Sequence, residues 1–153
     1  MEKFSVNVES VATGTDKTAI NLFNPVATPL TRARVFFISV GGTGTPSDES
    51  ASFVFQRTSA LGTEGSGLVP HNVDPGGPAG EYDSGLGVFG AEPTYTSAKI
   101  FLRLPANHRI TAQWYSNPGC EFILAATQNN GGGLKSTVST ATQAYGSTIL
   151  FEV

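Results

Sequence analysis

Few side chains in this sequence are of the types that carry out chemistry. It contains two histidines, His71 and His108, and one cysteine, Cys120. His71 and Cys120 would form a base and a nucleophile if the fold brought them together, with Asp74 orienting the imidazole. A free cysteine is more often a small buried apolar residue, and His71 follows Pro70 in a loop. We therefore expect no catalytic dyad, and we expect His108 to be a solvated turn residue.

The acidic residues in the middle of the chain could supply ligands to a metal ion. Asp74, Glu81 and Asp83 offer the oxygen atoms that calcium prefers, but they lack the alternating spacing of an EF-hand loop. Residues 85–90 match the pattern G-x-G-x-x-G, yet they lack the preceding strand and following helix of a dinucleotide site. We expect these glycines to serve turns. The sequence thus predicts no cofactor, no metal site and no enzymatic activity.

Length, composition and charge narrow the class of protein. A chain of 153 residues is expected to form one domain that buries about 68–70% of its unfolded surface. Charged residues make up only 14% of it, and ten phenylalanines supply a core, which is typical of an all-β protein with many turns. A net charge of −3, without clustered lysine and arginine, predicts no direct nucleic-acid partner. No signal-peptide pattern and no apolar run of about 18 residues is visible, so we expect synthesis in the cytoplasm and no membrane partner.

Alternation of apolar and polar residues predicts strands along most of the chain. No segment has a helical period. Residues 31–40 and 50–57 are expected to pair as a wide hairpin, and residues 95–104 and 109–115 as a tight one, while the glycine-rich residues 129–133 should form a flexible turn. The expected strands cover residues 4–9, 18–23, 31–40, 50–57, 95–104, 109–115, 122–126, 134–139 and 147–153.

Strands separated by turns at this spacing favour an antiparallel β-sandwich of the jelly-roll type. An immunoglobulin-like sandwich is the alternative. It is disfavoured because we expect more than seven strands and because the Cys…Trp…Cys spacing is missing.

Residues 59–93 interrupt the β pattern between two strand-rich halves. A glycine or proline recurs every few residues, so no apolar period persists, and at most a short strand is expected at residues 68–71. Long loops of more than about 12–15 residues are uncommon and are often functional. We therefore expect a long loop or arm here, and it is the first place to look for function. It carries five acidic residues and no lysine or arginine: Glu64, Asp74, Glu81, Asp83 and Glu92.

Apolar side chains on this loop would be costly if they faced water. Two arrangements stay open: the loop docks on a partner, or it folds back over its own sheet. The first strand could pair with the sheet edge of a neighbouring molecule or with a strand of its own chain. Pairing within its own chain ranks first. The candidate partner-contact residues are Leu68, Val69, Pro70, Tyr82, Leu86, Val88 and Phe89 of the loop, and Phe4, Val6 and Val8 of the first strand.

Three stretches of the sequence resemble small virion proteins of tailed bacteriophages. They are ARVFFISVGGTGTPSDESASFVFQRT, KIFLRLPANHRITAQWYSNPGCEFIL and TILFEV. The chain resembles in particular the capsid decoration, or auxiliary head, proteins. This resemblance implies a β-sandwich or jelly-roll core, no catalytic residues, and a location on the exterior of the phage head. It also implies a homotrimer that binds the shell of major capsid protein and stabilises it against the internal DNA.

Two other classes of function stay open. A carbohydrate- or receptor-binding module would use Tyr95, Trp114 and Tyr115 as stacking rings, although alternation places Trp114 on the inward face with Ile110. A hydrolase or isomerase on a cupin-like roll would require a bound metal ion.

Overall fold

The computed structural model describes residues 1–12, 16–28, 31–64, 66–80, 82–86, 89–137 and 144–153. These residues form strands and no helix, so none of the described segments is a helix that could span a membrane. The strands are β1 (Lys3–Ala12), β2 (Lys17–Phe23), β3 (Arg34–Gly42), β4 (Ser50–Ala60), β5 (Ser66–Leu68), β6 (His71–Asn72), β7 (Asp83–Leu86), β8 (Thr94–Asn107), β9 (Ala112–Tyr115), β10 (Phe122–Ile123), β11 (Gly131–Ser136) and β12 (Ala144–Glu152).

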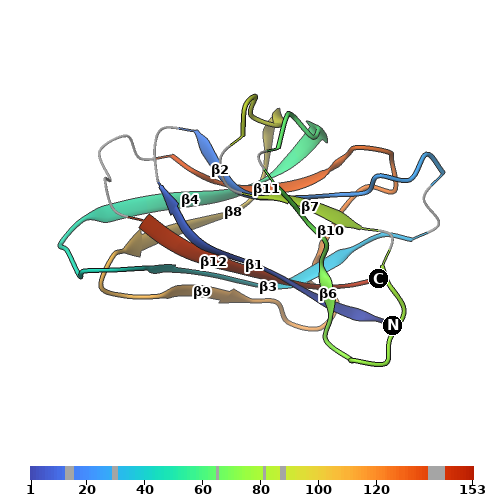
Figure 1. The fold of residues 1–153 in the computed structure, drawn as a ribbon, viewed down its shortest axis with the longest axis horizontal. Coiled ribbons are helices and arrows are strands. Elements are labelled where there is room, and N and C mark those ends of the chain that lie inside the picture. The colour runs from blue at the N-terminus through green and yellow to red at the C-terminus, as the bar shows by residue number, and fades with distance from the viewer. Residues whose placement is uncertain (13–15, 29–30, 65, 81, 87–88, 138–143) are drawn as a thin grey trace.

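The strands form two antiparallel sheets that pack face to face (Figure 1). Sheet A has the order β10-β3-β12-β1-β6, and β9 also pairs with β3. Sheet B has the order β5-β7-β2-β11-β4-β8. The predicted all-β antiparallel sandwich is confirmed.

Four strand pairs show how the chain is wrapped. β1 pairs with β12, β2 with β11, β3 with β9 and β4 with β8, each pair antiparallel and nested inside the one before. The chain is thus one long antiparallel double strand whose tip lies between β4 and β8. Because successive pairs alternate between sheets A and B, the double strand is rolled up, as in a jelly roll. Residues 59–93 are inserted at its tip, and we call them the tip segment.

Both predicted hairpins are wrong. β3 lies in sheet A and β4 in sheet B, and β8 and β9 are divided between the sheets in the same way. An isolated bridge between Asn107 and Ile110 closes the turn that connects β8 to β9. The alternation of each strand is compatible with either arrangement, because it shows which face is buried but not which strand lies alongside.

The glycine-rich turn predicted at residues 129–133 is also wrong in part. Gly131, Gly132 and Gly133 are buried and open β11, which lies between β2 and β4 in sheet B. A Cβ on Gly132 would lie 2.5 Å from the ring of Phe55, and one on Gly131 would lie 1.8 Å from the carbonyl oxygen of Leu22. Glycine is therefore required here by close approach of neighbouring strands, not by a turn.

The core fills the space between the two inner faces. Aromatic rings contact one another within it, including Phe4 with Phe151 at 5.4 Å and Phe53 with Tyr145 at 5.3 Å between ring centroids. The largest fully buried side chains are Tyr145, Phe4, Phe53, Phe55, Phe151, Ile20, Leu22, Ile38, Leu124, Leu134, Ile149 and Val6.

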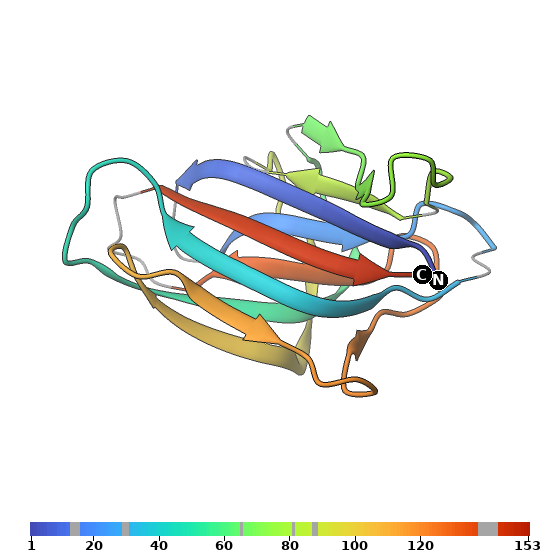
Figure 2. The same ribbon diagram turned by 90° about the horizontal axis from the view of Figure 1, so that it is seen from below.

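The two ends of the chain meet in sheet A. Glu2 and Val153 exchange backbone hydrogen bonds of 3.1 and 3.0 Å, and both termini lie at the same end of the sandwich (Figure 2). β1 pairs with β12 of its own chain from Lys3 to Ala12, with one register shift between Val8 and Val11. The first-ranked prediction for β1, pairing within its own chain, is confirmed.

Candidate functional site

His71 and Cys120 lie at opposite edges of sheet A. His71 begins β6, whereas Cys120 is exposed in the turn before β10. The strands β1, β12 and β3 lie between them, and four strand spacings of about 4.8 Å place the edges roughly 19 Å apart. This separation is too large for a hydrogen bond between the two side chains.

His108 is buried, with 5% of its surface exposed, and the prediction of a solvated turn residue is wrong. The backbone N–H of Ser47 donates to Nδ1 at 3.2 Å, and Nε2 lies 3.0 Å from the carbonyl oxygen of Thr43. With Nδ1 as acceptor, Nε2 carries the proton and donates it to Thr43. The ring also lies edge-on to Tyr145, at 5.3 Å between centroids. The side chain of His108, in the turn between β8 and β9, therefore holds the connection between β3 and β4 in place through these hydrogen bonds.

Asp74 and Asp83 are engaged locally rather than with each other. The carboxylate of Asp74 accepts a hydrogen bond from Gly76 N–H at 3.0 Å, and that of Asp83 accepts one from Ser84 N–H at 2.8 Å. Glu81, the third acid considered for a cation, lies outside the described residues. Among the residues that the structure does describe, no group of three or more His, Cys, Asp or Glu side chains could hold a metal ion.

The G-x-G-x-x-G pattern begins inside a strand. Gly85 belongs to β7 and pairs with Asn21 of β2, while residues 87–88 lie outside the described part of the chain. A Cβ on Gly85 would lie 2.5 Å from Oε2 of Glu64 and 3.1 Å from the ring of Phe89. This glycine allows close packing within the tip segment and does not form the turn that we expected at this position.

The tip segment adds short strands to both sheets along one side of the sandwich (Figure 2, green). β6 pairs with β1 through Phe4 and Ser5. β7 pairs with β2, and β5 pairs with β7. Strands of two to four residues need no sustained apolar period, which is why the sequence indicated at most one of them.

Asn72 fastens the middle of the tip segment. Its Nδ2 donates to Oε2 of Glu2 and to the carbonyl oxygen of Pro78, both at 3.0 Å. Its Oδ1 accepts a hydrogen bond from Asp74 N–H at 2.9 Å. Sequence reasoning did not find this residue, although an asparagine that binds the backbone two residues ahead is a known turn signal.

The ten candidate contact residues are placed differently from one another. Val69 is 60% exposed, and Val8 is half-buried. Leu68 lies on β5 and Leu86 on β7, but the structure describes only the backbone of these two residues. Val88 lies outside the described residues. The remaining five are buried within their own chain and present no surface to a partner in this structure: Phe4, Val6, Pro70, Tyr82 and Phe89.

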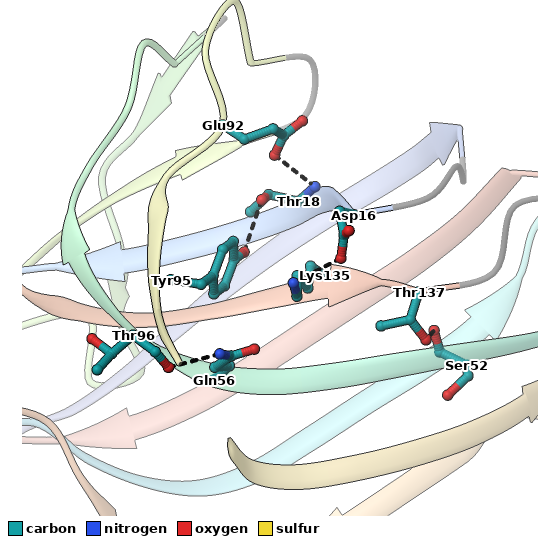
Figure 3. Close-up of polar contacts among 9 residues, drawn as sticks. All are labelled: Asp16, Thr18, Ser52, Gln56, Glu92, Tyr95, Thr96, Lys135 and Thr137. Carbon is teal, nitrogen blue, oxygen red and sulfur yellow. Dashed lines mark hydrogen bonds and ion pairs between the residues drawn. The ribbon is translucent and has the colours of Figure 1, made fainter. Parts of the chain in front are cut away.

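A polar cluster fixes the return of the tip segment to β8 (Figure 3). Glu92 accepts a hydrogen bond from Thr18 N–H at 3.0 Å, and the hydroxyls of Thr18 and Tyr95 are 2.8 Å apart. Lys135 lies 4.5 Å from the centroid of the Tyr95 ring and forms a 2.7 Å ion pair with Asp16. No sequence signal marks this cluster, because its members are far apart in the chain.

Electrostatics keep Tyr95 neutral. Burial raises the pKa of its hydroxyl well above the ordinary value, the hydrogen bond with Thr18 lowers it in part, and the carboxylates of Glu92 and Asp16 raise it further. A neutral tyrosine already hydrogen-bonded to Thr18 is a structural contact. We therefore assign this cluster to positioning of the tip segment.

The three aromatic residues considered for carbohydrate stacking differ in access. Tyr95 is held in the polar cluster, and Trp114 is half-buried and stacked on Phe122, with centroids 4.1 Å apart. Tyr115 is 68% exposed on the outer face of sheet A, where its ring rests on Phe37 at 4.6 Å. Ile110, expected to share the inward face of Trp114, is 68% exposed because β9 begins only at Ala112.

Comparisons of the chain with protein-family models, with curated proteins and with solved structures gave no match.

Proposed function

We propose that this chain is a non-enzymatic structural protein of a bacteriophage virion, a decoration protein that binds the exterior of the head shell as an oligomer. The observation that carries the proposal is the rolled double strand. Jelly rolls recur in viral capsid domains, where a rigid sandwich presents its surfaces to neighbouring subunits. The resemblance of three long stretches of the sequence to decoration proteins points the same way, and for that family it implies a trimer on the shell.

The arrangement of the tip segment fits this role. Its three strands and the polar cluster of Tyr95 hold the described parts of the segment against both sheets, so these parts present an ordered surface. Surfaces that need no ordering on binding lose less conformational entropy when they dock. A repeated shell then multiplies many modest contacts into strong attachment.

Binding to phage heads tests the proposal. Purified chain is mixed with heads that were assembled without it, from the phage that encodes it, and free chain is removed by sedimentation. We expect the chain to sediment with the heads in a fixed ratio to the major capsid protein. We also expect the heads to disrupt at a higher temperature, because a ligand that binds only the assembled state stabilises that state. Chain that stays in the supernatant would contradict the proposal.

A carbohydrate-binding module is the second candidate, and the exposed ring of Tyr115 favours it. The residues paired across sheet A beside this ring, Asn7, Thr148, Ser39 and Gln113, are polar and uncharged, as suits a neutral sugar. On a glycan array, binding that is lost in Tyr115→Ala and kept in Tyr95→Phe would support this function. An array without any binding would remove it.

A further inference from the structure

Opposite edges of the sandwich carry opposite charges. Residues 59–93 contain five acidic residues and no lysine or arginine, whereas residues 94–115 contain three lysines or arginines and no acidic residue. We define the acidic edge by Glu9 of β1 together with Asp74 and Asp83 of the tip segment. We define the basic edge by Lys99 and Arg103, both exposed on β8. Arg109, the third cation, forms an ion pair with Asp48 at 2.6 Å and is left out.

The topology separates these edges by the full width of the molecule. β8 ends sheet B at the side opposite to β5 and β7, and β9 and β10 end sheet A at the side opposite to β6 (Figure 2). Five strand spacings across sheet B amount to roughly 24 Å. This is about three times the Debye length of about 8 Å at physiological salt, so each edge acts as a separate charged surface.

Each edge also exposes apolar side chains. Val69 and Val73 are 60% and 57% exposed on the acidic edge. Ile100 of β8 and Ile110 of the following turn are 37% and 68% exposed on the basic edge. Both edges thus combine an excess of one sign of charge with apolar groups that would gain from being covered, and on the acidic edge the exposed cation Lys3 lies beside Asp74.

Direct addition of strand to strand is blocked at these edges. Pro105 lies within β8 and has no N–H to donate, and the pairing of β8 with β4 shifts register three times. β1 has its own register shift between Val8 and Val11. Irregular edges of this kind resist open-ended pairing, so a contact here must use side chains.

We propose that the basic edge of one copy of this chain binds the acidic edge of a second copy. A two-fold contact would place like charges opposite each other, whereas a head-to-tail contact places acidic residues against Lys99 and Arg103. Head-to-tail contacts close into rings when the rotation between copies allows it. This inference rests on the oligomer of the proposed function and names the surfaces that form it.

Charge reversal tests the contact, with mass measured by light scattering coupled to size exclusion on the full chain. Lys99→Glu with Arg103→Glu reverses the basic edge, and Glu9→Lys with Asp74→Lys reverses the acidic edge. We expect each double variant to raise the dissociation constant of the oligomer by about tenfold or more, because like charges then face each other. The chain with all four substitutions should regain the oligomer, since both edges have exchanged sign.

The matched control is Arg32→Glu with Arg34→Glu, the same change of charge at exposed residues before and at the start of β3. It should leave the mass unchanged. Raising salt from about 0.05 to about 0.5 M should weaken the wild-type oligomer, because salt screens contacts between charges. Circular dichroism verifies that every variant is folded.

Four outcomes would overturn this inference: a strictly monomeric wild type, an unchanged mass for both double variants, a folded four-substitution chain that stays monomeric, or equal loss in the control. A monomer that still sediments with phage heads would overturn the head-to-tail contact and the oligomer, and would leave the proposed binding to the head standing. Double variants that keep their mass but lose head binding would assign the edge to the shell instead.

Discussion

At the scale of single residues, His108 shows how a polar side chain can act in folding instead of catalysis. Both ring nitrogens are used, one by Ser47 and one by Thr43, and the ring packs against Tyr145. A Cβ on Gly42 would lie 2.3 Å from the imidazole, so the backbone itself is shaped around this ring. The histidine thus links the β8–β9 turn to the β3–β4 connection at one end of the sandwich.

Replacing His108 with alanine should therefore destabilise the fold. The two backbone groups lose their partner and a cavity opens beside Tyr145, so we expect the free energy of unfolding to fall by about 1–3 kcal/mol. Urea denaturation followed by circular dichroism measures this. His71→Ala, at an exposed residue, should change stability by no more than about 0.5 kcal/mol. An equal effect of the two substitutions would contradict the structural role.

Glu64 is a residue whose charge costs stability. Its Oε2 is buried and has no hydrogen-bond partner among the described residues. Burial first, and then the neighbouring carboxylate of Asp83, raise the pKa of Glu64 above its usual value of 4.5. The folded state therefore holds this proton to a higher pH than the unfolded state does. Between pH 4.5 and the folded pKa, stability falls as pH rises.

Glu64→Gln should remove that pH dependence. At neutral pH the variant should be more stable than the wild type, because an amide carries no charge to desolvate. Well below pH 4.5, Glu64 is protonated in both the folded and the unfolded state of the wild type. The difference in free energy of unfolding between wild type and variant should then vanish. Denaturation curves at several pH values test this, with Glu9→Gln on an exposed side chain as the control. A constant difference at all pH values would show that the carboxyl charge is not its cause.

At the scale of elements, β11 is the strand whose sequence least resembles a strand. Three consecutive glycines begin it, and they are pressed between Leu22, Phe55 and the ring of Tyr95. The absence of side chains lets the ring of Phe55 lie against Gly132 on one face of the strand and the ring of Tyr95 against Gly133 on the other. Glycine is needed here because neighbouring residues leave no space for a side chain, and the local sequence pattern gives no sign of those neighbours.

Gly132→Ala should be clearly destabilising. Its Cβ would lie 2.5 Å from Phe55 and 3.0 Å from Leu124, so the core must shift, and we expect a loss of about 1–3 kcal/mol. Gly90→Ala is the matched control, because its Cβ would have no neighbour closer than 3.6 Å. Thermal unfolding of both variants decides the point. Similar melting temperatures would mean that β11 has more room than its neighbours indicate.

At the scale of the whole molecule, the nested pairing makes the last strand central. β12 lies between β1 and β3 in sheet A, so the first and the last strand of the chain pair with each other in the middle of this sheet. Its inward side chains Ile149 and Phe151 are 0% and 1% exposed. The sandwich therefore cannot be assembled stepwise from one end, because its first strand needs its last.

Removing residues 146–153 should abolish the fold. The truncation deletes buried core side chains and exposes the facing edges of β1 and β3, so we expect loss of the cooperative unfolding transition. Circular dichroism and heat denaturation measure it. Removing only Met1, which is 82% exposed, should leave the transition unchanged. A cooperative transition in the truncated chain would show that sheet A folds without β12.

Alternation and composition alone determined that this protein is all-β and built from half-buried strands, because each such strand shows its period of two locally. Only the tertiary structure decided which strands are neighbours, since pairing depends on contacts between residues far apart in the chain. It placed Tyr82 and Phe89 inside the molecule, buried His108, and turned three glycines into the start of a central strand. It also placed the acidic tip segment and the basic strand β8 at opposite edges, where the charge pattern becomes a pair of separate surfaces.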